Sequence, residues 1–154
     1  MTISFKSKMS FSSSGMEFSN SIMEKFDSLL DQYNRSFKTN NQTLIFAGKI
    51  ASLLSILYQP ESPYNSYCTG TIKNEIAKCH DKLGDSVRAS NEFLAAARVY
   101  ADGAKFFYEN SREANRLWEP LLDLSISSYS NVIQILTKKK KPSLAVQIYR
   151  EISA

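Results

Sequence analysis

A short turn at Gly84-Asp85, with helical patterns on both sides, restricts the fold of this chain more than any other feature. Apolar side chains recur every three or four residues over 64–83 before the turn and over 89–100 after it. Glycine commonly follows the last residue of a helix because it takes a positive φ without strain, and aspartate is a favoured N-cap. With almost no loop between them, these two helices are expected to lie antiparallel and in contact.

The same periodicity predicts four further helices, and the expected fold class is therefore all-α. The six segments cover roughly residues 20–37, 44–58, 63–83, 85–103, 119–138 and 145–152. Residues 103–118 are less regular, so Gly103 is interpreted as the end of the fourth helix. No segment shows the period-two alternation of a β-strand. The apolar stripe expected on the fifth helix consists of Leu122, Ile126, Tyr129, Ile133 and Leu136.

The length of 154 residues suits one domain, which we assign to residues 20–154 after a disordered, Ser-rich tail at 1–19. No run of about 18 apolar residues is present, so no membrane insertion is expected. The net charge of +4 is a mild excess that does not by itself indicate nucleic-acid binding. Cys68 and Cys79 would lie about 16 Å apart along one helix, too far for a disulfide, and are expected to be buried thiols of an intracellular protein.

The turn also carries the signature of a helical repeat. Small residues and an aromatic follow it at helical spacing, and this pattern resembles the tetratricopeptide repeat, in which small side chains let two antiparallel helices approach closely. A weaker second copy stands near the C-terminus, and an insertion within 103–118 would separate the two copies. The residues expected to pack the repeat are Ile76, Ala77, Gly84, Ala89, Phe93, Ala96, Ala145 and Tyr149.

Longer stretches are similar to the N-terminal part of the 40-kDa huntingtin-associated protein family. They are Pro63-Tyr64-Asn65-Ser66-Tyr67-Cys68, Ala77-Lys78-Cys79, Glu92-Phe93-Leu94-Ala95-Ala96-Ala97-Arg98-Val99-Tyr100, Glu119-Pro120-Leu121 and Ser143-Leu144-Ala145-Val146. The likeness covers roughly residues 22–154. It implies a tetratricopeptide-like α-solenoid that docks between the helical-repeat arms of huntingtin and stabilises it, with a link to early endosomes through a small GTPase. Members of that family are longer than this chain.

The usual sequence signatures of catalysis and cofactor binding are missing. The chain has no Gly-rich phosphate loop and no GxSxG nucleophile elbow. His80 is the only histidine, and with the two cysteines it does not make up a four-ligand zinc set. Glu24, Asp27 and Asp31 repeat at helical spacing, which a solvated helix face explains better than a catalytic pair. We therefore expect a protein that is not an enzyme and that uses no cofactor or metal.

Two groups of residues are candidates for contacting a protein partner. The first is an aromatic group, Phe106, Phe107, Tyr108 and Trp118. Such side chains either anchor an interface or fold back onto the core. The second is a lysine run, Lys138, Lys139, Lys140 and Lys141. The run either complements the carbonyl end of a helix or offers a basic patch to an acidic partner, the nuclear-import machinery or nucleic acid.

We expect a scaffold or adaptor that binds another protein, with huntingtin as the partner that the resemblance implies and an endosomal small GTPase pathway as a further link. Two other functions stay open: a trafficking adaptor similar to the soluble NSF attachment proteins, and a nuclear or nucleic-acid-associated module that uses the lysine run. The leading hypothesis places the protein in the cytoplasm, with the nucleus or early endosomes as further locations, and includes no nucleic acid. Because the last helix leaves an apolar face uncovered, the chain is also expected to continue a longer solenoid or to need a partner at that end.

Overall fold

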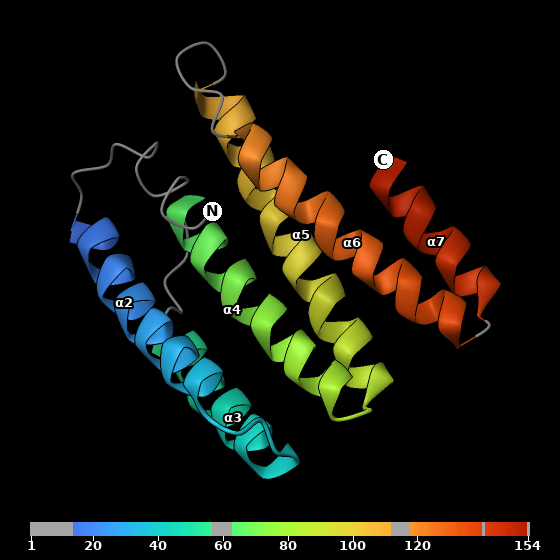
Figure 1. The fold of residues 1–154 in the computed structure, drawn as a ribbon. Coiled ribbons are helices and arrows are strands. Elements are labelled where there is room, and N and C mark those ends of the chain that lie inside the picture. The colour runs from blue at the N-terminus through green and yellow to red at the C-terminus, as the bar shows by residue number, and fades with distance from the viewer. Residues whose placement is uncertain (1–13, 57–62, 112–117, 140, 154) are drawn as a thin grey trace.

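The computed structural model describes residues 14–56, 63–111, 118–139 and 141–153, and in these ranges the expectation of an all-α fold is confirmed. Figure 1 shows the helices as a row in chain order, with neighbours antiparallel and α3 behind α2. Each helix packs mainly against the next one along the chain, and the α4–α5 and α5–α6 contacts are the most extensive. The helices are α2 (Ser14–Arg35), α3 (Asn40–Ile56), α4 (Pro63–Lys82), α5 (Ser86–Ser111), α6 (Trp118–Lys138) and α7 (Pro142–Ser153).

The turn between α4 and α5 has the predicted geometry. Gly84 has a φ of 81°, a conformation that side chains with a Cβ rarely adopt. The N–H groups of Gly84 and Asp85 donate to the carbonyls of Asp81 and His80, at 3.1 and 2.9 Å, which satisfies the free carbonyls at the end of α4. The Asp85 carboxylate then accepts from the N–H of Arg88 at 3.1 Å and caps α5. The positive φ of Gly84 and the cap supplied by Asp85 thus reverse the direction of the chain.

Two helix boundaries differ from the sequence prediction. Helix α2 begins at Ser14, so residues 14–19, which we assigned to the tail, are helical, while residues 1–13 lie outside the described residues. Helix α5 passes through Gly103 and continues to Ser111, so residues 103–111 are regular helix rather than an irregular insertion. Gly103 is a packing residue: a Cβ there would lie 2.7 Å from the Cβ of Ser66 on α4 and 3.2 Å from Cδ1 of Leu121 on α6.

Two clusters of buried apolar side chains form the core, one on each side of the α4–α5 pair. The first unites α2 and α3 with α4, α5 and Leu121 at the start of α6, and the second unites α4 and α5 with the rest of α6 and with α7. Neighbouring residues divide between them: Ile76 and Ala96 belong to the first cluster, whereas Ala77 and Ala97 belong to the second. Because successive residues of a helix point about 100° apart, both helices of the pair are buried on two faces.

Close approach of α4 and α5 depends on a glycine facing an aromatic ring. A Cβ on Gly70 of α4 would lie 2.5 Å from Cε1 of Tyr100 on α5, so the ring occupies the space that any larger residue needs. The Tyr100 hydroxyl forms a 2.9 Å hydrogen bond with that of Thr71, and burial raises the pKa of Tyr100 far above its usual range. The ring is therefore fixed by packing on one side and by a hydrogen bond at its tip.

Most of the residues expected to pack the repeat are buried. Ala89, Ala96 and Ala77 are fully buried, and Ile76, Phe93 and Ala145 are buried as well. Cys68 and Cys79 are buried free thiols of the first cluster, as predicted, and burial raises the pKa of Cys79 to about 11. The prediction for Tyr149 is wrong, because 56 % of this side chain is exposed on the outer side of α7.

A three-residue polar contact attaches α7 to the rest of the molecule. Arg98 of α5 donates two hydrogen bonds to the Glu151 carboxylate of α7, at 2.9 and 3.1 Å. The Tyr129 hydroxyl of α6 donates to the same carboxylate. The hydrogen bond with Arg98 holds the pKa of Glu151 below its usual value, against the effect of burial, and the Tyr129 hydrogen bond adds to this lowering. One carboxylate therefore fixes α7 against both preceding helices.

The Gly70–Tyr100 contact predicts opposite outcomes for the same substitution at two helical glycines. In an exposed helix, Gly→Ala stabilises by about 0.5–1 kcal/mol, and Gly48→Ala should do so because nothing lies within 4 Å of its new Cβ. Gly70→Ala should instead lower the free energy of unfolding by about 1–3 kcal/mol through overpacking. Urea denaturation measures both values. A stabilised Gly70→Ala variant would show that α4 and α5 lie further apart than described.

The Glu151 contact predicts a pH-dependent loss of stability. A carboxyl whose pKa is lowered by folding stabilises the fold fully above its unfolded value, near 4.5, and loses that contribution as pH falls through the lowered folded value. At neutral pH, Glu151→Gln should reduce the free energy of unfolding by about 1 kcal/mol, which is the upper end of the range that exposed ion pairs contribute.

The difference between wild type and this variant should shrink as the pH falls below 4.5. Asp31→Asn is the matched control, because it breaks an exposed ion pair within one helix and should cost at most about 0.5 kcal/mol. A Glu151→Gln effect no larger than that of the control would contradict the assigned role.

Candidate protein-binding site

The lysine run lies where α6 ends and α7 begins, and backbone hydrogen bonds fix its position. Lys138 is the last residue of α6, and the N–H of Lys139 continues the helical pattern by donating to the Ile135 carbonyl at 3.0 Å. The N–H of Lys141 donates back to the Leu136 carbonyl at 3.0 Å. Lys140 lies outside the described residues. Cations at this end of a helix are favoured by the dipole, which accounts for their place in the chain.

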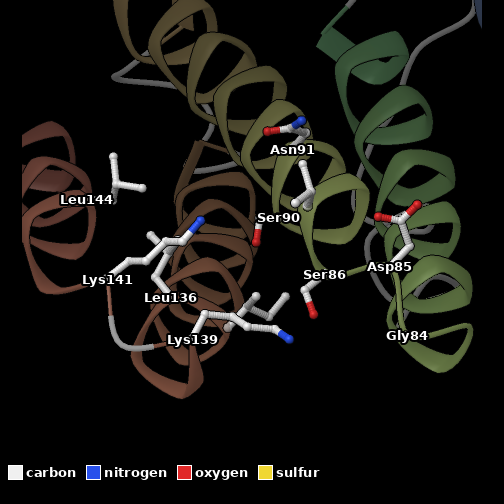
Figure 2. A pocket seen from close by; sticks show the side chains of 11 residues that line it. Gly84, Asp85, Ser86, Ser90, Asn91, Leu136, Lys139, Lys141 and Leu144 are labelled. Carbon is white, nitrogen blue, oxygen red and sulfur yellow. The ribbon is translucent and has the colours of Figure 1, made fainter.

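A groove of about 390 Å³ opens beside this run, between the N-terminal end of α5, the C-terminal end of α6 and the first turn of α7 (Figure 2). Its apolar lining consists of Val87, Ile135, Leu136 and Leu144. Its polar lining consists of Gly84, Asp85, Ser86, Ser90, Asn91, Lys139 and Lys141. The short turn at Gly84 shapes one wall, because it places the start of α5 directly beside the end of α6.

The charges of this groove are unbalanced. Figure 2 shows the ammonium group of Lys141 pointing toward Ser90 of α5 and that of Lys139 pointing toward Ser86 at the start of α5. Asp85 is the only acidic residue of the lining, and its carboxylate is engaged by Arg88, through the backbone N–H and through Nε at 3.5 Å. Among the described residues, Lys139 and Lys141 take part in no ion pair. The groove therefore presents two cations above an apolar floor.

The aromatic group and the lysine run do not form one site. Phe106 and Tyr108 are exposed near the C-terminal end of α5, whereas the lysines lie between α6 and α7, beside the N-terminal end of α5 (Figure 1). The side chains of Phe107 and Trp118 lie outside the described residues. The structure thus brings Lys139 and Lys141 together with a groove but places the predicted aromatic anchors elsewhere.

A second apolar surface was missed because sequence periodicity assigned it to the core. Leu122 and Ile126 continue the stripe of α6 that contains Tyr129 and Ile133, yet they are 40 % and 44 % exposed. Helix α7 has 12 residues against the 21 of α6, and it runs beside only the C-terminal half of α6 (Figure 1). Tyr129 and Ile133 therefore belong to the buried cluster that α7 completes. Leu122 and Ile126, which lie on the same stripe nearer the start of α6, are exposed.

Helix α7, which packs on α6, also has exposed apolar side chains. Val146 and Tyr149 lie one turn apart on the outer side of α7, and Arg150 and Ser153 join them around a shallow depression. We call Leu122, Ile126, Val146 and Tyr149 the α6–α7 face. The helical spacing of Leu122 and Ile126 was visible in the sequence, but only the length of α7 decides that they are exposed.

Other kinds of site have less support in the structure. Within the described ranges, no group of three or more His, Cys, Asp and Glu side chains could hold a metal ion. In the same ranges, no helix combines the length and apolar character needed to cross a membrane. The two features with an organised surface are thus the groove and the α6–α7 face.

Comparison of the chain with protein-family models, with curated proteins and with solved structures finds no match.

Proposed function

We propose that this protein is a non-enzymatic scaffold or adaptor that binds another protein through the α6–α7 face, as a tetratricopeptide-like helical-repeat module. The main support is the exposed stripe on α6, because large apolar side chains exposed on two neighbouring helices are typical of an interaction surface. The row of antiparallel helices, each packed on the next, also supports a repeat architecture.

A helix is the occupant that suits this face. Leu122 and Ile126 are four residues apart and Val146 and Tyr149 are three apart, so each pair forms a ridge along its helix. The two ridges lie on adjacent antiparallel helices, and an amphipathic helix buries its own stripe best between such ridges. The exposed side chains of Leu122 and Ile126 on α6 offer this partner helix an apolar contact.

The partner that we propose is huntingtin, whose helical-repeat arms would supply that helix. Support comes from the sequence resemblance to the huntingtin-associated family and from the helical surface itself. This function implies action in the cytoplasm, with early endosomes or the nucleus as further locations. A vesicle-trafficking adaptor that binds a coiled coil, or a nuclear module, would use other surfaces of the same helix row.

Replacement of the α6 ridge should weaken binding to purified huntingtin. The double variant Leu122→Glu and Ile126→Glu removes two apolar contacts, and it should retain its helix content because glutamate is a good helix former near a helix N-terminus. Central apolar contacts of an interface often contribute 1–2 kcal/mol or more each, so we expect affinity to fall by at least about tenfold in biolayer interferometry.

The matched control is Phe37→Glu with Leu44→Glu, which replaces two exposed apolar side chains at the other end of the helix row. This control should bind as wild type does. If wild-type protein fails to bind huntingtin, the proposed partner is wrong. If both double variants bind equally well, the α6–α7 face is not the contact surface.

A further inference from the structure

The groove beside the lysine run does not belong to the α6–α7 face. It is lined by the start of α5, the end of α6 and Leu144 of α7, whereas Val146 and Tyr149 line a separate depression. Leu144 and Tyr149 are five residues apart, which on an α-helix places them about 140° apart around the axis. The groove can therefore be occupied while the α6–α7 face is occupied or empty.

We propose that this groove binds an acidic, amphipathic peptide segment of a partner protein. The apolar floor would take one or two aliphatic side chains, and the ammonium groups of Lys139 and Lys141 would pair with carboxylates on either side of them. The volume of about 390 Å³ falls within the range of small ligand sites, and it suits a few side chains rather than a whole helix.

The charges around the groove indicate that the ligand is negatively charged. The carboxylate of Asp85 is already used to cap α5 and to pair with Arg88, so it leaves both lysines uncompensated. Lysine at the end of a helix is favoured wherever its ammonium points, but here both ammonium groups point over the groove (Figure 2). A carboxylate beside either lysine gains an ion pair and displaces none of those formed by the described residues.

A peptide fits better than a nucleic acid. Single-stranded nucleic acid is bound by a basic track combined with aromatic rings on which bases stack. No aromatic residue lines the groove, and four of its side chains are aliphatic. The backbone hydrogen bonds of Lys139 and Lys141 also place both residues at one turn, between α6 and α7, rather than along a track.

Fluorescence anisotropy with a designed probe tests the proposal. The probe is a fluorescein-labelled peptide in which two leucines, four positions apart, are flanked by glutamates. Wild-type protein should bind it, and the double variant Lys139→Glu and Lys141→Glu should weaken binding by at least about tenfold. The matched control Lys25→Glu with Lys105→Glu makes the same change in net charge on α2 and α5, away from the groove lining, and should leave the affinity within about twofold.

The apolar half of the site is tested separately. Leu144→Ser should weaken binding while the salt dependence of binding stays as in wild type, whereas the lysine variant should lose most of that dependence. Replacement of the peptide's leucines by serines should weaken binding to wild type about as much as Leu144→Ser does. These measurements do not involve huntingtin, so their outcome is separate from that of the proposed function.

Three results would overturn the proposal. The first is equal loss of affinity in the Lys139/Lys141 variant and in the Lys25/Lys105 control, which would indicate attraction by net charge alone. The second is an unchanged affinity for the peptide in the Lys139/Lys141 variant as well as in the Lys25/Lys105 control. The third is tight, steeply salt-dependent binding of a labelled oligothymidylate that displaces the peptide, which would identify a polyanion site instead.

Discussion

The close approach of α4 and α5 is the constraint on which the rest of the molecule depends. It requires glycine at position 70 facing the ring of Tyr100, glycine at position 103 facing Ser66, and alanine at positions 89, 96 and 97. The three-residue connection of Leu83, Gly84 and Asp85 then follows, because helices this close need no longer one. Since both helices are buried on two faces, every other helix is placed by packing onto this pair or onto a helix that does.

The sequence predicted those elements whose signals are local. Gly84 and Asp85 act through their own backbone and side-chain hydrogen bonds, so the turn could be identified without knowledge of its surroundings. Gly103 shows the opposite case. Its residue type suggested a helix end, but the reason for glycine there is the tertiary contact with Ser66 and Leu121, which no local pattern contains.

Burial at the candidate surfaces was hard to predict for a related reason. Helical spacing correctly grouped Leu122 and Ile126 with Tyr129 on one stripe of α6, but coverage of that stripe depends on the length of α7. Tyr149 was assigned to the core because it occupies a repeat position, yet the contacts of α7 run through Ala145 and Ile148 instead. The lysine run was evident from composition, whereas the apolar floor beneath it comes from three separate helices.

The division of the core has a consequence for how the molecule opens. The C-terminal part of α6 and helix α7 share their buried cluster with α4 and α5, whereas Leu121 at the start of α6 packs into the first cluster, so the α7 end can open while the central pair stays folded. Helix α7 is the shortest of the six and is attached through one carboxylate and a few apolar side chains. Since Leu144 and Tyr149 both belong to this helix, the segment that completes each candidate surface is also the shortest of the described helices. Occupation of either surface would therefore be coupled, through α7, to the order of the other.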